Sequence, residues 1–190
     1  MKKGIRQIQK EKTKEKILES AYTVYCEKGF AATTSLVAET AGVSHGTIFV
    51  HFSTQHELLN AVIDQFGKKM GALLHELSEG KNTLIELLHA HLDLLEEHEP
   101  FYRRLVTEYP LLPEESKLIF LQMQAVAGYH FNKVLEEDEI KPIPFHMIFN
   151  MWIGLVHYYL QNKPLFAPMG SVIQKHRHEL IESFSAMVYE

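Results

Sequence analysis

The feature that most constrains this chain is residues 34–52, whose pattern predicts two short helices joined by a tight turn. Gly42 suits the turn because glycine adopts a left-handed backbone at almost no cost. Ser44 follows two residues later and can cap the second helix with its hydroxyl oxygen. Each helix has one apolar face, formed by Val37, Ala38 and Ala41 in the first and by Ile48 and Phe52 in the second. The pattern predicts a helix-turn-helix, a motif whose second helix enters the major groove of DNA.

The residues around this turn resemble a known family. Gly-Phe-Ala-Ala-Thr-Thr at 29–34, the segment 41–52 and Glu-Leu-Leu at 57–59 closely resemble the DNA-binding domain of the TetR family of transcriptional regulators. The resemblance covers about residues 12–63, roughly a third of the chain. It implies an all-α fold of about nine helices. Residues 1–54 would form a three-helix DNA-binding domain with a basic N-terminal arm, and residues 55–190 a larger helical domain for ligand binding and dimerisation.

Composition sets the broad class of the protein. The chain has 190 residues, of which 46% are hydrophobic, enough for a packed core. No apolar run is long enough to span a membrane, and the lysine-rich N-terminus lacks the apolar stretch of a secretory signal. Cys26 is the single cysteine, so no disulfide can form within the chain. We therefore expect a cytoplasmic protein that makes no contact with membranes.

Charge is divided unevenly along the chain. The net charge is −5, yet residues 1–52 contain eight Lys or Arg against five Glu. A basic head on an acidic body is expected when one end of a protein meets phosphate. Lys2, Lys3, Arg6 and Lys10 predict a mobile basic arm, with helix beginning near residue 10 or 11. Both a DNA-binding arm and a solvated tail remain open for this segment.

The second helix of the motif, about residues 44–52, is the predicted recognition helix. His45 and Thr47 lie near its start and face base edges, Gly46 permits close approach, and Val50 can meet a thymine methyl group. By resemblance, His51 matches a phosphate contact of the family. Phe49 stands where the family usually has a phosphate-bonding tyrosine, and Gln55 where it usually has a lysine. The full predicted DNA-binding set is Thr34, Ser44, His45, Gly46, Thr47, Phe49, Val50, His51 and Gln55, with Lys12 and Lys16 of the first long helix.

The body is predicted to be helical and rich in aromatic and methionine side chains. Helices are expected at about 55–77, 83–97, 101–109, 114–137, 145–161 and 171–189, with a loop at 162–170. Such a lining suits an apolar effector pocket. The best candidates by resemblance are Phe101, Tyr102, Phe120, Met123, Phe149 and Trp152. The alternative is that these side chains are simply core.

The last two long helices are the expected dimer interface. The helix at 145–161 is apolar nearly all round, which indicates burial on all sides. By resemblance, these two helices of each subunit form a four-helix interface. The contributors are Trp152, Leu155, Val156, Tyr159, Leu180, Phe184 and Met187. A dimer also presents two recognition helices, which together read a palindrome.

Other site chemistry is not indicated. The 12 histidines include no zinc-like spacing, and we find neither a phosphate-binding glycine loop nor a nucleophile motif. We expect no metal, no cofactor and no enzymatic activity. The sequence predicts a dimeric repressor that binds a palindromic operator and is released by a small, largely apolar effector. The alternative is a regulator with a filled core, controlled by a partner protein or by its abundance.

Overall fold

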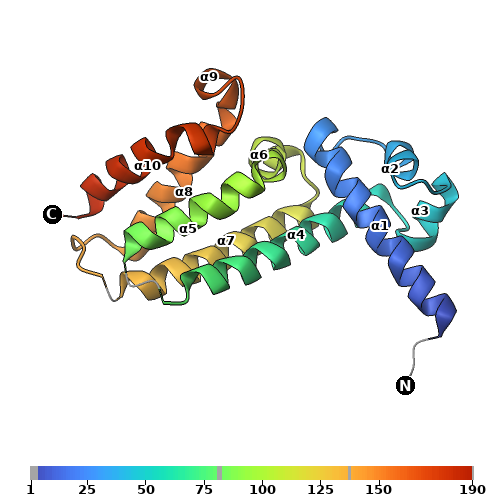
Figure 1. Ribbon diagram of the computed structural model, residues 1–190, viewed down its shortest axis with the longest axis horizontal. Coiled ribbons are helices and arrows are strands. Elements are labelled where there is room, and N and C mark those ends of the chain that lie inside the picture. The colour runs from blue at the N-terminus through green and yellow to red at the C-terminus, as the bar shows by residue number, and fades with distance from the viewer. Residues whose placement is uncertain (1–3, 81–82, 137, 190) are drawn as a thin grey trace.

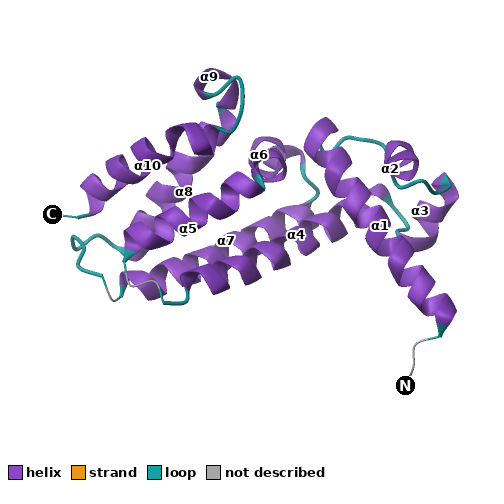
Figure 2. Cartoon of the chain, in the orientation of Figure 1, coloured by secondary structure: helices purple, strands orange, loops and turns teal. Residues whose placement is uncertain are grey.

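The computed structural model describes residues 4–80, 83–136 and 138–189, and within them the chain is helical without β-strands (Figures 1 and 2). The all-α prediction is confirmed. The elements are α1 (Ile5–Lys28), α2 (Thr34–Thr40), α3 (His45–His51), α4 (Gln55–Ser78), α5 (Leu84–Glu97), α6 (Glu99–Glu108), a 3-10 turn (Tyr109–Leu111), α7 (Glu114–Leu135), α8 (Phe145–Gln161), α9 (Lys163–Phe166) and α10 (Val172–Val188). None of these helices is both long and apolar enough to cross a bilayer.

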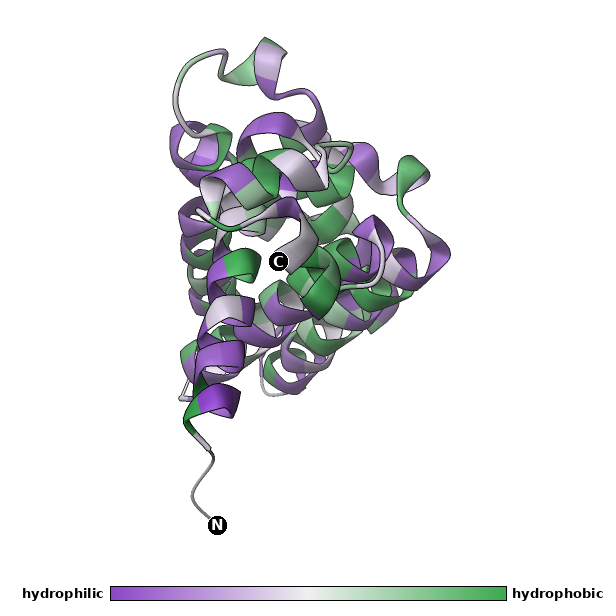
Figure 3. Ribbon diagram, turned by 90° about the vertical axis from the view of Figure 1, so that its right-hand side faces the viewer, coloured by the Kyte–Doolittle hydropathy of each residue, from purple (hydrophilic) through white to green (hydrophobic). Residues whose placement is uncertain are grey.

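The start of α1 corrects the prediction of a mobile arm. The helix begins at Ile5, and Gly4 is its N-cap, so Arg6 and Lys10 lie on helical turns. Gln7 donates a hydrogen bond from Nε2 to Oε1 of Glu11 at 3.1 Å. These turns extend away from the rest of the molecule (Figure 1), and most of their length is hydrophilic (Figure 3). A solvated helix has no apolar period, which is why periodicity placed the start too late. Lys2 and Lys3 lie outside the described residues.

A second correction concerns the segment 162–170, predicted as a loop. It contains α9, a single helical turn with Pro164 at its start. Proline is tolerated in the first turn of a helix because the N–H it lacks would have no partner there. Lys163 closes the turn, since its ammonium lies 3.4 Å from the carbonyl oxygen of Ala167. With this short helix, the described part of the chain has ten α-helices, where about nine were predicted.

Helices α1, α2 and α3 form the small domain at one end of the molecule (Figure 1). Its core is apolar and closed, with Ile17, Ala21, Tyr25, Val37, Ala41 and Ile48 all fully buried. Ile48 and Phe52 point inward as predicted. The next helix, α4, is capped by Thr54, whose Oγ1 accepts from Glu57 N at 3.0 Å, and the Glu57 carboxylate accepts from the N–H of Ser53, one residue before the cap, at 2.7 Å.

The body is built on the pairing of α4 with α7, which is the most extensive helix contact in the described residues. Gly67 and Gly71 of α4 lie at this contact. A Cβ added at Gly71 would lie 3.5 Å from Cγ1 of Val126, an ordinary van der Waals distance, so the helix spacing does not itself require glycine there. Helices α5, α6, α8 and α10 complete the body, and Trp152 of α8 is fully buried at its centre.

Glu99 fixes the position of α10. Its carboxylate is 4% exposed and accepts hydrogen bonds from the backbone N–H groups of Val172 and Ile173, both at 3.2 Å, and from the hydroxyl of Ser171. The ammonium of Lys163 lies 3.4 Å away. A carboxylate at a helix N-terminus satisfies free N–H groups and interacts favourably with the helix dipole. The sequence pattern gave no sign of this long-range cap.

Candidate functional site

The turn between α2 and α3 adopts the geometry that its sequence predicts. Gly42 has φ of +59°, a left-handed conformation that strains other residues. Its N–H donates to the carbonyl of Glu39 at 3.0 Å, and the N–H of Val43 donates to that of Ala38 at 3.0 Å. Ser44 caps α3 by accepting from the N–H of Thr47 at 3.2 Å. Hydrogen bonds within the helix-turn-helix therefore fix the turn between α2 and α3.

Thr33 is the N-cap of α2, and Thr34 is the first residue of the helix. Thr33 Oγ1 accepts from Leu36 N at 3.4 Å. Thr34 is buried, and its hydroxyl lies 2.9 Å from Nε2 of His45. The imidazole of His45 also packs edge-on against Phe49, with 5.1 Å between ring centroids. The predicted DNA-facing residues Thr34 and His45 thus form a bonded pair that joins α2 to α3.

The outward face of α3 is left open. Gly46 is exposed, and a Cβ added there would meet only Ser44 Oγ, at 3.9 Å. Val50 is 68% exposed and Phe49 is 46% exposed. Thr47 is partly covered, with its hydroxyl 2.8 Å from that of Ser44. An exposed valine and phenylalanine on a polar helix face are typical of a surface that meets a partner.

Basic side chains lie beside the end of α3. Lys14 has its ammonium 5.4 Å from the ring centre of Phe52, and the charges of Lys10 and Lys14 act on His51. Burial, and then these two lysines, lower the pKa of His51 below its ordinary value. His51 is therefore neutral at pH 7 in the free protein. Lys14 is not among the predicted contacts, although its spacing of four from Lys10, on one helix face, was an available signal.

The remaining predicted contacts lie around this face. Lys12 and Lys16 are exposed on α1, and the Lys16 ammonium reaches the turn at Gly42, 3.6 Å from where a Cβ would lie. Gln55 is turned inward, since its amide donates to the carbonyl of Ala32 at 3.1 Å. Gln55 stands where a phosphate-binding lysine was expected by resemblance. Its side chain instead holds the loop between α1 and α2 in place.

A junction of aromatic rings joins this domain to the body. Phe101 of α6 is fully buried and stacks on Tyr22 of α1, with 4.6 Å between ring centroids. It also contacts Phe66 of α4 at 4.7 Å and Phe30 at 5.5 Å. Phe101, a predicted pocket residue, therefore belongs to the junction of α1, α4 and α6.

Ionic contacts reinforce the same junction. Arg104 of α6 donates to Oε1 of Glu108 at 2.9 Å and to the carbonyl oxygens of Glu27 at 3.0 Å and Cys26 at 3.4 Å. Those carbonyls are in the last turn of α1, which lacks partners within its own helix. Oε2 of Glu108 accepts from the N–H of Phe30 at 2.8 Å. One arginine and one glutamate thus tie α6 to the end of α1.

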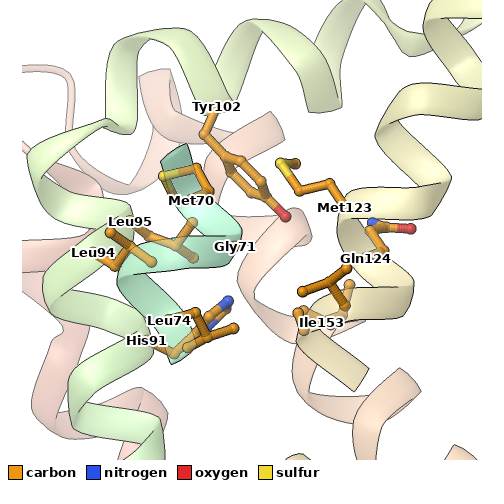
Figure 4. Close-up of a pocket in the computed structure, with 12 residues that line it drawn as sticks. Met70, Gly71, Leu74, His91, Leu94, Leu95, Tyr102, Met123, Gln124 and Ile153 are labelled. Carbon is orange, nitrogen blue, oxygen red and sulfur yellow. The ribbon is translucent and has the colours of Figure 1, made fainter. Parts of the chain in front are cut away.

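The body contains an apolar cavity beneath this junction (Figure 4). Five helices line it, with Met70, Gly71, Leu74, His91, Leu94, Leu95, Tyr102, Met123, Gln124, Val126, Ala127 and Ile153. The space open to water centres is about 30 Å³, which holds about two water molecules. Two predicted pocket residues, Tyr102 and Met123, line it.

The other predicted pocket residues lie elsewhere in the body. Phe120 is buried beside His157, with 6.3 Å between ring centroids. Phe149 lines an open groove between α7 and α8, against Gly128. Trp152 lies behind the cavity wall and donates from Nε1 to Nδ1 of His91 at 3.1 Å. His91 and Gln124 are lining residues that the sequence analysis missed, because apolar periodicity does not show which polar residue of a buried helix faces a cavity.

The predicted interface residues divide into two groups. Trp152, Val156, Leu180 and Phe184 are buried within the single chain. Leu155 and Tyr159 are partly exposed, and Met187 is 48% exposed. Met147 and Tyr158 of α8 are also exposed apolar residues. Among the described residues, no group of three or more His, Cys, Asp or Glu is arranged to hold a metal ion.

Comparisons with known proteins agree with this arrangement. Residues 17–62 match the family model of bacterial regulatory proteins of the tetR family. An HTH-type transcriptional repressor of Mycobacterium tuberculosis is 41% identical over 71 residues, which span 37% of this chain and 37% of that protein. The match therefore covers little more than a third of the relative's length.

Solved structures match over nearly the whole chain. A TetR-family regulator from Agrobacterium tumefaciens superposes with a TM-score of 0.75 at 16% identity, over 92% of this chain and 98% of that one. FadR of Bacillus subtilis, solved with stearoyl-CoA, gives 0.69 at 17% identity, over 90% and 96%. These likenesses show the shared fold. Residues 17–62 therefore match the tetR family of bacterial regulatory proteins, and the chain as a whole shares the fold of the TetR-family structures.

Proposed function

We propose that this protein is a dimeric transcriptional repressor that binds a palindromic operator through α3 and is released by a small effector in the body cavity. The observation that carries the proposal is the α3 surface. Gly46, Phe49 and Val50 are exposed on a short helix that is held by its cap and by the Thr34–His45 pair. Lys14 and His51 lie at the end of that helix, where a phosphate would meet them.

In this proposal, residues at the start of α3 determine which DNA sequence is bound. The lysines around α3 provide most of the affinity for DNA. Thr47 and His45 face base edges, and Val50 offers a methyl surface to thymine. Lys10, Lys14 and Lys16 contact phosphates and fix the register. A phosphate beside His51 favours the imidazolium form, so this side chain takes up a proton when DNA binds. The hydroxyl lost at Phe49 and the charge lost at Gln55 shift phosphate binding toward these lysines.

The body is proposed to control the spacing of two DNA-binding domains. In α4, Met70 lines the cavity and Phe66, one turn earlier, lies in the aromatic junction. In α6, Tyr102 lines the cavity and its neighbour Phe101 lies in the junction. A ligand that pushes Met70 and Tyr102 apart therefore moves α1 as well. The coupling required between the two sites is about 1–3 kcal/mol.

The second subunit is proposed to pack on α8 and α10. Met147, Leu155, Tyr158 and Met187 offer apolar surface there, while the buried Val156, Leu180 and Phe184 support these helices from within. Two recognition helices about 34–36 Å apart then read successive major grooves. A regulator without an effector is the alternative, and the small size of the cavity is the observation in its favour. The stearoyl-CoA bound to Bacillus subtilis FadR is far too large for this cavity, so that ligand is not carried over.

The proposal is tested by fluorescence anisotropy with the duplex immediately upstream of the coding sequence and with a scrambled duplex of the same composition. Titrations over a range of salt separate the contribution of phosphate contacts from that of base contacts. Binding that depends on phosphate contacts alone loses affinity steeply as salt rises. Thr47→Ala should reduce binding to the upstream duplex about 10-fold and leave binding to the scrambled duplex unchanged. A Thr47→Ala protein as tight as wild type on the upstream duplex would remove α3 from its proposed role.

A further inference from the structure

None of the described residues that line the cavity has a charged side chain. The polar groups of the cavity wall are the imidazole of His91, the hydroxyl of Tyr102 and the amide of Gln124, and its other lining residues are apolar or glycine (Figure 4). An ionised ligand in such a space would lose its hydration without gaining a counter-charge. The cavity wall therefore disfavours anionic and cationic ligands, whatever their shape.

The hydrogen bond from Trp152 sets the protonation of His91. An indole N–H can only donate, so Nδ1 of His91, 3.1 Å from Nε1 of Trp152, must accept and carries no proton. Burial lowers the pKa of His91 to about 3, so the ring is neutral at pH 7. A neutral imidazole that accepts at Nδ1 has its proton on Nε2. His91 thus brings one N–H donor to the cavity wall.

Of the other two polar groups, the hydroxyl of Tyr102 is already paired. It lies 2.9 Å from Nε2 of His157. Burial lowers the pKa of His157 to about 4, so this ring is neutral too. The bond to His157 engages the hydroxyl of Tyr102. Gln124 is only partly buried, whereas His91 is 4% exposed. The N–H of His91 is therefore the buried donor that can orient a ligand.

We propose that the cavity binds a small, uncharged, mainly apolar molecule with one hydrogen-bond acceptor, such as a ketone or ester oxygen, which accepts from Nε2–H of His91. The inference rests on the proposed role of the cavity as the effector site. It narrows the effector to a chemical class and excludes carboxylates and phosphate esters.

The ligand reaches the cavity between α4 and α7. On the outer side of these helices lies an open groove of about 310 Å³, which shares Gly71, Met123 and Val126 with the cavity wall. Met123 is only partly buried and stands between the two spaces. Methionine is unbranched and adapts to irregular spaces, so rotation of Met123 and Met70 joins groove and cavity and makes room for a ligand larger than two waters.

Three probes of one shape test the proposal. They are cyclohexyl methyl ketone, isopropenylcyclohexane, in which CH₂ replaces the oxygen, and cyclohexanecarboxylate. Dissociation constants are measured by calorimetry on the full chain. Trp152, the single tryptophan, reports binding in the body by fluorescence, and the weak absorption of the ketone is corrected with free tryptophan at the same probe concentration. The ketone should bind about 10-fold more tightly than the alkene, and at least about 100-fold more tightly than the carboxylate.

Two variants of His91 assign the preference to this residue. His91→Gln keeps one acceptor for Trp152 and one donor for the ligand, so it should retain the preference for the ketone. His91→Leu removes both groups and should bind ketone and alkene equally. Circular dichroism checks that each variant is folded.

Several results would overturn the proposal. They are equal binding of ketone and alkene by wild type, tighter binding of the carboxylate, or no binding of the ketone at millimolar concentration. DNA binding is measured separately. If the ketone binds as expected and operator affinity does not change, the ligand class stands and the release mechanism fails.

Discussion

Arg104 allows a direct test of the contact between the body and the DNA-binding domain, because it joins α6 to the end of α1. Its guanidinium reaches Glu108 at 2.9 Å and the carbonyls of Glu27 and Cys26 at 3.0 and 3.4 Å, and it is 23% exposed. Arg104→Met keeps the apolar stem and removes all three hydrogen bonds. A single buried hydrogen bond to a charged group contributes about 1.5–3 kcal/mol to stability. Because the guanidinium is partly exposed, we expect its three hydrogen bonds together to contribute about 2–3 kcal/mol.

The expected result is a fall of about 2–3 kcal/mol in the free energy of unfolding, measured by urea denaturation with far-UV circular dichroism. Arg103→Met on the same helix is the matched control, since its guanidinium makes none of these three hydrogen bonds. A cycle with Glu108→Gln should give a coupling energy of about 1 kcal/mol between the two side chains. A loss below about 0.5 kcal/mol for Arg104→Met, or an equal loss for Arg103→Met, would refute this account of the junction.

Three further predictions concern the turn, the buried histidines and the last helix. Gly42→Ala places a Cβ at φ of +59° and should lower the free energy of unfolding by about 1–2 kcal/mol in the same urea assay; no loss would mean that the turn relaxes. Burial lowers the pKa values of His91 and His157 to about 3 and 4, below the 6.5 of the unfolded chain, so acid protonates the unfolded state first. Stability should therefore fall by about 1.2 kcal/mol per histidine at pH 5.5 relative to pH 7, and replacement of both by glutamine should reduce that dependence. Glu99→Gln weakens the cap of α10 and should lower the free energy of unfolding by about 1.5–3 kcal/mol, whereas an unchanged value would show that the amide caps the helix equally well.

The DNA-binding domain was predictable because local signals agree there. Gly42, the Ser44 cap and the apolar positions Ile48 and Phe52 lie within one short stretch and act on one another. The start of α1 was placed too late, since helical turns in solvent have no apolar period to detect. The general class and number of helices followed from the sequence, apart from the single turn of α9.

Long-range pairing was beyond the sequence pattern. The bond between Arg104 and the end of α1 joins residues 77 and 78 positions apart, and the bond between Trp152 and His91 joins residues 61 apart. The aromatic residues of one amphipathic helix can point into the junction, the cavity or the core. Small differences in the rotation of the helix decide which of these surroundings each residue meets. Phe101 and Tyr102 are adjacent in sequence, yet one lies in the junction and the other in the cavity. Periodicity indicates burial and does not distinguish between buried surroundings.

The measurement that tests the central claim most directly is selection of bound duplexes from a random DNA pool, followed by sequencing and by determination of the number of chains per duplex. The account predicts one enriched palindrome bound by two chains, with half-sites centred about one helical turn or a small multiple of it apart. The Thr47→Ala protein should relax the preference at one symmetric pair of positions. Recovery of no enriched sequence, with binding that follows only salt, would contradict the claim that α3 reads DNA.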